Sequence, residues 1–184
     1  NFGDSYGRFA FNNYYGEGSR WERQVVLTRE GFFVVLDRYK GGEVLGEEYS
    51  AGPVWHVGFD EPVEEGAQVE SWFDFPPLDN AWWKKKKSRA LLIAHPHPEA
   101  KYGRVKQRNS QDTSPNVTVY SYRPISATND EYFLNVFIPY DLPVDTTSIV
   151  KKTKTHLDSM GRAEVDLGHA GIKILIDKSW YVSR

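Results

Sequence analysis

The stretch RWERQVVLTREGFFVVLDRY, residues Arg20–Tyr39, decides the fold class of this chain. In its first half, residues alternate so that one face of the strand is mostly polar and the other combines polar and apolar residues. The run Phe32–Leu36 in its second half is continuously apolar. Gly31 precedes that run, and short runs bounded by glycine are typical of strands rather than of a helix. After a turn-rich gap, the segment Tyr49–Val57 (YSAGPVWHV) carries a Trp-His pair. The stretch therefore predicts two long neighbouring strands and a third strand that carries this pair.

The pattern of strands and turns continues through the rest of the chain. No window places apolar residues at i, i+3, i+4 and i+7 over three turns, so no long helix is expected. Apolar residues keep a period of two through residues 165–176, across the turn Gly168–Gly171, which predicts a hairpin with one buried face. The predicted strands are 7–12, 20–28, 31–38, 47–57, 68–73, 90–95, 117–123, 131–138, 162–168, 171–176 and 180–182. We expect an all-β fold, a two-sheet antiparallel β-sandwich of about ten or more strands.

Composition and charge exclude several classes of protein. The chain has 184 residues, 40% of them hydrophobic and 15% aromatic, which excludes intrinsic disorder and suffices for a proper core. No apolar run approaches the roughly 20 residues that a membrane helix needs, so no membrane span is expected. A net charge of −2 gives no electrostatic case for a nucleic-acid partner. Since there is no cysteine, disulfides, thiolate nucleophiles and cysteine zinc sites are excluded.

The start of the sequence bears on domain organisation. The chain begins at Asn1, without methionine or a charged-then-apolar leader. A cleaved signal and a domain taken from a longer protein would both look like this, and the strand-like, aromatic run Asn1–Arg8 favours the second. No internal repeat or linker divides the chain. We expect residues 1–184 to form a single β-sandwich domain of a larger multidomain protein.

The segment Ala81–Arg89 (AWWKKKKSR) is aromatic and then basic. One interpretation is a solvated loop or strand edge, because lysines at an edge prevent unwanted pairing. The other is a saccharide surface, on which a tryptophan offers a flat face to a sugar ring and the lysines meet carboxylate or sulfate. A nucleic-acid surface would also combine these residue types, but the acidic chain disfavours it. The candidate substrate-binding residues are Trp55, Trp82, Trp83, Lys84 and Lys85.

Two histidine patterns raise the question of a metal. His56 follows Trp55 in a predicted strand and Asp37 closes the preceding one, so both side chains could converge on one cation. Zinc accepts such ligands, although a structural site needs about four; the alternative is a hydrogen-bonded, half-buried histidine. In His95-Pro-His97-Pro98 the prolines favour an irregular loop over a metal site on a strand. No Gly-x-Ser-x-Gly and no glycine-rich phosphate loop is present, so no catalytic residue is assigned.

Four segments together resemble the C-terminal sandwich of heparinase II/III-type polysaccharide lyases. They are Trp21–Val25 (WERQV), Arg29–Asp37 (REGFFVVLD), Trp55-His56 and Tyr132–Pro139 (YFLNVFIP). The resemblance covers nearly the whole chain and implies the same all-β sandwich.

The resemblance also implies a function. Such lyases combine an N-terminal helical toroid with this sandwich and cleave acidic polysaccharides by β-elimination, using a base, a charge-neutralising group and an acid. In the family, the sandwich contributes a histidine from a His-Asn motif, and this sequence contains no His-Asn dipeptide. The chain is therefore expected not to be catalytic alone. The resemblance further implies a divalent metal, zinc or calcium, at Asp37 and His56.

The implied partners are an acidic polysaccharide and the helical toroid of the same protein, in a periplasmic or secreted bacterial enzyme. Two alternatives stay open at this point. One is an autonomous carbohydrate-binding module that uses Trp82, Trp83 and the lysine run. The other is a structural or interaction sandwich without a ligand.

Overall fold

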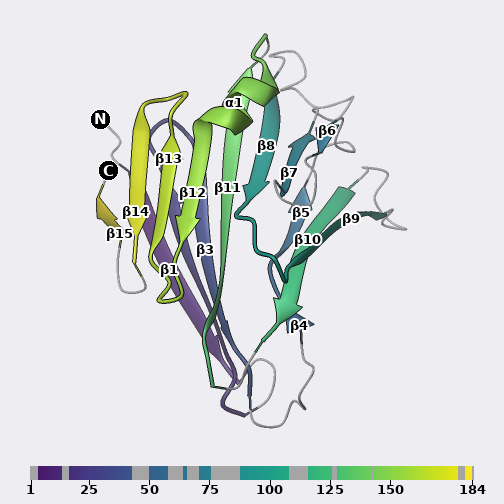
Figure 1. The fold of residues 1–184 in the computed structure, drawn as a ribbon, viewed down its shortest axis with the longest axis vertical. Helices are drawn as coiled ribbons and strands as arrows, with labels where there is room; N and C mark the ends of the chain where they lie inside the picture. Colours follow the sequence, from purple (N-terminus) through teal and green to yellow (C-terminus); the bar gives the residue numbers. More distant parts are fainter. Residues whose placement is uncertain are drawn as a thin grey trace.

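The computed structural model describes residues 4–13, 17–42, 50–57, 64–65, 71–75, 88–107, 116–125, 128–141, 143–177 and 181–183. Almost all of the regular structure is strand (Figure 1). The strands are β1 (Ser5–Asn12), β2 (Arg20–Leu27), β3 (Phe33–Lys40), β4 (Ser50–Ala51), β5 (Val54–Val57), β6 (Glu64–Glu65), β7 (Ser71–Phe75), β8 (Ser88–Ala94), β9 (Lys101–Gln107), β10 (Asn116–Pro124), β11 (Glu131–Asp141), β12 (Thr153–Leu157), β13 (Ala163–Leu167), β14 (Ile172–Ile176) and β15 (Tyr181–Ser183), and the helix is α1 (Thr146–Lys152).

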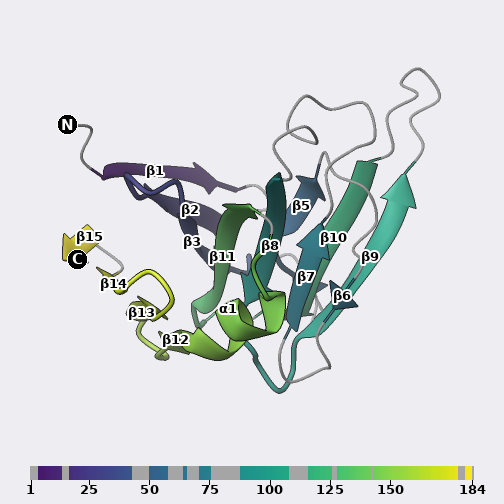
Figure 2. The same cartoon turned by 90° about the horizontal axis from the view of Figure 1, so that it is seen from above.

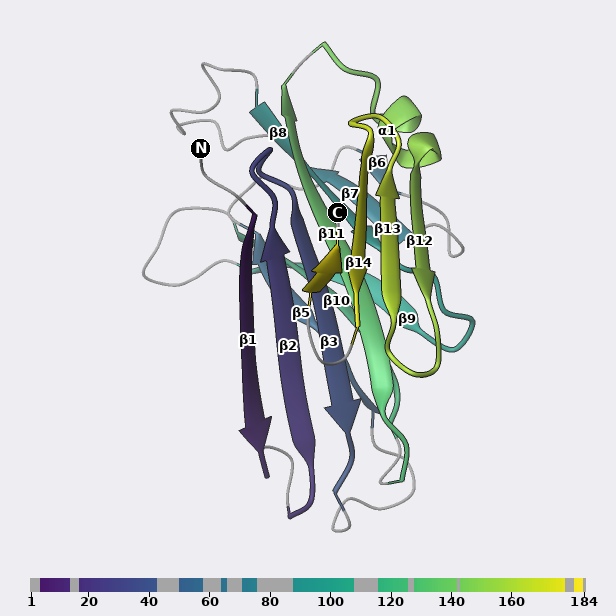
Figure 3. The same cartoon turned by 90° about the vertical axis from the view of Figure 1, so that its left-hand side faces the viewer.

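The described strands pair into three antiparallel sheets. The central sheet has seven strands in the order β1-β2-β3-β11-β8-β7-β6, and Figure 3 shows β1, β2 and β3 side by side in it. A second sheet has the order β4-β10-β5, with β9 also paired to β10, and a third has the order β12-β13-β14-β15. The view from above separates the third sheet from β9 and β10, with the central sheet between them (Figure 2). The predicted all-β antiparallel sandwich of about ten or more strands is confirmed, but the described strands form three sheets where two were expected.

The central sheet is covered on both faces because β3 and β11 are apolar on both faces. In β11, Leu134 and Val136 are buried in the cluster that includes Ile174 of the third sheet. Phe137, which points the other way, packs against Trp55 of the second sheet with ring centroids 4.8 Å apart. A strand that is buried on both faces has a continuously apolar sequence, as Phe32–Leu36 has, rather than an alternation of apolar and polar residues.

The third sheet buries one face only. Its strands β13 and β14 form the predicted hairpin, in which Leu167 lies opposite Ile172 and buried residues alternate with more exposed ones. This hairpin is therefore confirmed. The other face of the sheet carries polar residues such as Glu164 and Lys173.

The two-residue strand β6 was missed from sequence, and so were two longer strands, β9 and β12. The sequences of β9 and β12, KYGRVKQ and TKTHL, are polar and lack a strong apolar alternation. Both lie at the edge of a sheet, where one side of the strand pairs with no other described strand and polar residues are tolerated. The predicted strand 47–57 is two short strands, β4 and β5, within the described residues. The helix α1 has seven residues and begins after Asp145, whose side chain accepts the backbone N–H of Thr147.

Gly161 offers a test of how the third sheet packs against the central one. Its φ is +80°, and a Cβ added there would overlap the ring of Tyr132 in β11. We expect Gly161→Ala to lower the free energy of unfolding by about 2–4 kcal/mol, from the left-handed backbone and the overlap together. Gly171→Ala is the control, because Gly171 also has a positive φ but open space around it. It should cost only about 1–2 kcal/mol in urea unfolding, and equal losses for the two variants would contradict the packing argument.

Candidate functional site

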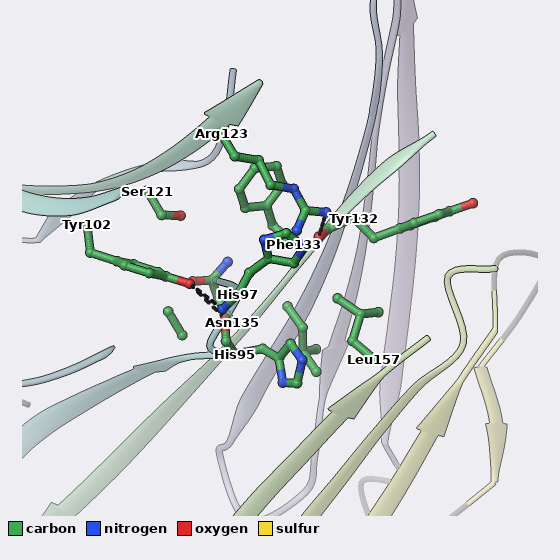
Figure 4. A pocket seen from close by; sticks show the side chains of 11 residues that line it. His95, His97, Tyr102, Ser121, Arg123, Tyr132, Phe133, Asn135 and Leu157 are labelled. Carbon is green, nitrogen blue, oxygen red and sulfur yellow. Dashed lines mark hydrogen bonds between the residues drawn. The ribbon is translucent and has the colours of Figure 1, made fainter. Parts of the chain in front are cut away.

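A cleft of about 610 Å³ opens where the three sheets meet. Its walls come from the loop after β8, the end of β10, the start of β11 and the turn between β12 and β13. At its inner end lies a smaller pocket with about 10 Å³ of space, shown in Figure 4, which is enough for about one water molecule. Residues shared by the cleft and the small pocket are His95, His97, Arg123, Tyr132 and Leu157.

His95 ties the sheets together at this junction. Its backbone N–H donates to the carbonyl of Leu134 in the central sheet, and its Nδ1 lies 2.8 Å from the hydroxyl of Thr155 in the third sheet. Its carbonyl accepts a hydrogen bond from Tyr102 of β9. Burial, with smaller contributions from His156, His97 and Arg123, lowers the pKa of His95 to about 4. The imidazole is therefore neutral at physiological pH.

The tautomer of His97 follows from its hydrogen bonds. Its Nδ1 accepts the backbone N–H of Glu99 at 3.2 Å, and its own backbone N–H donates to the hydroxyl of Tyr102. Burial and then the charge of Arg123 lower the pKa of His97, while Glu99 opposes this effect. A neutral imidazole with Nδ1 as acceptor carries its proton on Nε2. His97 can therefore donate a hydrogen bond through Nε2.

Arg123 supplies the main positive charge of the cleft, although only 5% of its surface is exposed. Its Nη2 lies 2.9 Å from a carboxylate oxygen of Glu131 and donates to the carbonyl of Tyr132, and its guanidinium lies 4.8 Å from the ring centre of Phe133. Burial lowers the pKa of Arg123 and raises that of Glu131, and each charge opposes the shift of the other. Within the described residues, Nε of Arg123 is buried without a partner. The protein covers this atom, so a ligand in the cleft does not contact it in this structure.

The other carboxylates of the cleft already have partners. Asp130 accepts from Arg38 at 2.7 Å and from the hydroxyl of Tyr132 at 3.4 Å. Asp158 accepts the backbone N–H groups of Met160 and Arg162. Each of these carboxylates can accept further hydrogen bonds, so the cleft offers acceptors beside the donors of His97 and Arg123.

The structure does not bring the two predicted metal ligands together. Asp37 is fully buried in the central sheet, and its carboxylate accepts Nε and Nη2 of Arg23 at 2.7 and 2.9 Å and the indole N–H of Trp21 at 3.2 Å. Burial raises the pKa of Asp37, and Arg23 opposes that rise. The guanidinium already supplies the positive charge that a metal ion would bring.

His56 lies in β5 of the second sheet, exposed, with Nδ1 3.0 Å from the hydroxyl of Thr118. Its neighbour Trp55 points the opposite way, into the space between the sheets, where Arg23 lies 4.2 Å from its ring centre. Trp55 therefore serves packing between the sheets, and its predicted role in substrate binding stays a prediction. The other predicted binding residues, Trp82, Trp83, Lys84 and Lys85, lie outside the described residues.

Sequence reasoning missed the residues that form the cleft. Arg123, Glu131 and Tyr132 received no role, and His95 and His97 were considered only as metal ligands. The available signal was an isolated arginine at the end of the apolar strand 117–123, next to Pro124. A charged residue at such a position is buried only with a partner, and that partner is not visible from local sequence.

Of three comparisons with known proteins, the one with solved structures finds similar folds. No protein-family model matches the chain, and no curated protein sequence matches it. The heparan sulfate lyase HepC from Pedobacter heparinus matches with a TM-score of 0.61 at 12% identity, over 100% of this chain and 28% of the lyase. The heparinase III named the BT4657 gene product has a TM-score of 0.64 at 13% identity, over 95% of this chain and 26% of that protein.

A further heparinase III structure matches with a TM-score of 0.65 at 13% identity, over 96% of this chain and 26% of that protein. This chain thus spans about a quarter of the length of these lyases. Identity at this level shows a common fold, and the predicted resemblance is confirmed at that level. The described part of the chain contains no helix that is long and apolar enough to cross a membrane.

Metal content tests the predicted site at Asp37 and His56. Within the described part of the chain, no group of three or more His, Cys, Asp or Glu side chains is placed to hold a metal ion. Because Arg23 already neutralises Asp37, we expect wild type and His56→Ala to carry equal, substoichiometric zinc and calcium in elemental analysis. Stoichiometric metal in the wild type that is lost from His56→Ala would contradict this expectation and establish the metal site.

The buried imidazole of His95 predicts a pH dependence of stability. Its pKa rises from about 4 in the folded protein to its ordinary value of 6.5 on unfolding, so the unfolded chain binds more protons between these values. Stability should therefore fall by about 2–3 kcal/mol as the pH drops from 6.5 to 4. Urea unfolding across this range should show a shallower fall in His95→Gln. An unchanged pH profile in the variant would assign the effect to other groups.

Proposed function

We propose that this chain is the sandwich domain of a polysaccharide lyase that acts on acidic, uronate-containing glycans by β-elimination. The observation that carries the proposal is the likeness of the fold to one part of a heparan sulfate lyase and of two heparinase III structures. The likeness extends over at least 95% of this chain in each of the three structures compared. The helical toroid is the proposed partner in the same protein, and a periplasmic or secreted bacterial location is proposed with it.

Two groups of the cleft support an acidic substrate. Arg123 is a cation and Nε2 of His97 is a donor, whereas the carboxylates of Glu131 and Asp130 are each paired with an arginine. A uronate carboxylate or a sulfate supplies acceptor oxygens for such donors, and hydrogen bonds to charged groups are the strong ones. Since the cleft is partly shielded from water, each such bond is stronger than it would be at an open surface.

The same geometry supports a domain that is not catalytic alone. β-Elimination needs a base that removes the proton next to the uronate carboxylate, besides a group that stabilises the resulting charge. Arg123 has the charge for the second task. For the first, His97 in its neutral form already carries a proton on Nε2, and His95 is engaged by Thr155. Since neither histidine of the described cleft is placed to act as the base, we assign the base to the partner domain.

Binding by the chain alone tests the proposal. In affinity electrophoresis, gels containing heparan sulfate, hyaluronan or alginate should retard the chain, and the retardation should fade with salt because it depends on charge. A neutral glucan gel should have no effect. His97→Ala should weaken the retardation, whereas His156→Ala, an exposed substitution in β12, should leave it unchanged.

Lyase activity of the chain is the second measurement that tests the proposal. The chain incubated with heparan sulfate should produce no increase in the ultraviolet absorbance of unsaturated uronate. Free migration of the wild type in every acidic gel, or equal retardation by the neutral glucan, would refute acidic-glycan binding. Release of unsaturated product by the chain alone would refute the assignment of the base to a partner.

A further inference from the structure

The outer face of the second sheet carries a group of residues distinct from the cleft, four of them exposed and Tyr120 half-buried. Strand register places them on one side, since Tyr120 of β10 lies opposite Val54 of β5, and Tyr122 lies opposite Lys101 of β9. His56 lies on the same side, opposite Thr118. We call Val54, His56, Lys101, Tyr120 and Tyr122 the tyrosine face.

The tyrosine face points away from the core. Val119, which alternates with these tyrosines along β10, is buried against the central sheet instead. Val54 is 50% exposed and Tyr122 is 36% exposed, and His56 and Lys101 are exposed as well. In Figure 2, β9 and β10 lie at the right-hand side of the molecule, far from β12, β13 and β14.

The two tyrosine rings form a shallow aromatic platform. Their centroids are 6.1 Å apart and their planes differ by 30°. Gly103 lies opposite Tyr120, and a Cβ added there would collide with Oη and Cζ of that ring. The ring of Tyr120 therefore lies across the glycine, with one face on the sheet and the other turned outward.

The charge on the tyrosine face is positive. Nζ of Lys101 lies 6.0 Å from the ring centre of Tyr122. His56 uses Nδ1 for its contact with Thr118, which leaves Nε2 for another group. Among the described side chains on this side of β5, β9 and β10 there is no carboxylate. A ligand with apolar ring faces and negative charges is complementary to both features.

We propose that the tyrosine face binds an acidic polysaccharide, with sugar rings stacked on Tyr120 and Tyr122 and a carboxylate or sulfate paired with Lys101. The C–H groups of a pyranose ring form an apolar surface that packs on an aromatic ring, while its acidic substituents remain at the rim. The glycan class rests on the proposed function, whereas the location on the second sheet rests on the geometry of this face alone. The face would hold the chain of a long substrate outside the cleft.

The test compares the affinity of variants for heparan sulfate in isothermal titration calorimetry. Tyr122→Ala and Lys101→Ala should each bind about two- to tenfold more weakly than wild type. Phe11→Ala and Lys173→Ala are matched controls, because Phe11 is 47% exposed on β1 and the Lys173 side chain is 80% exposed on β14. Both should bind as wild type does. Circular dichroism and thermal unfolding of each variant would exclude loss of the fold.

The outcomes separate this inference from the proposed function. If both Tyr122→Ala and Lys101→Ala bind with wild-type affinity, glycan binding at the tyrosine face is refuted, whereas acidic-glycan binding elsewhere on the domain is not. Absence of heparan sulfate binding by the wild type would overturn both. Equal affinity for a neutral glucan would overturn the acidic ligand, and a dimer in sedimentation that Tyr122→Ala dissociates would assign the face to a second copy of the chain.

Discussion

The structure depends on one constraint, which is that the central sheet has apolar side chains on both faces. Val34 and Leu36 of β3 point toward the third sheet, whereas Val35, between them, points the other way and is equally buried. Neither face can be left to water, because each exposed apolar side chain forfeits about 1.5–3 kcal/mol of burial. Two smaller sheets therefore cover the central one, and the residues at their junction become partly or wholly buried.

Polar groups at this junction are buried as a consequence, and each is tied to a neighbouring sheet. Arg123 of the second sheet bonds Glu131 and the carbonyl of Tyr132 in the central sheet. His95 at the end of β8 bonds Thr155 in the third. Burial of such groups is tolerated only with partners, so the contacts that hold the sheets together also orient the donors of the cleft. Stability and recognition are thus properties of the same residues.

Under the proposed function, the cleft and the tyrosine face would offer two different kinds of contact to an acidic glycan. The cleft is partly shielded and holds the Arg123 cation and the His97 donor, so we propose it for the acidic groups of a sugar. The tyrosine face is open, with two aromatic rings and Lys101, so it suits sugar ring faces along an extended chain. A polysaccharide is long enough to engage both, and linked contacts raise affinity beyond that of either alone. Both surfaces are consistent with a domain that positions substrate while another domain supplies the base.

The sequence by itself determined most of the longer strands, the hairpin of β13 and β14 and the all-β class, because a period of two and the turn residues are local properties. It did not reveal β9 and β12, since edge strands tolerate polar residues. Nor did it reveal that Asp37 forms an ion pair with Arg23 in the adjacent strand. Only the tertiary structure decided these pairings and the cleft. Sheet order brings together residues that are distant in sequence, such as His95 and Thr155, and no local pattern records which strands become neighbours.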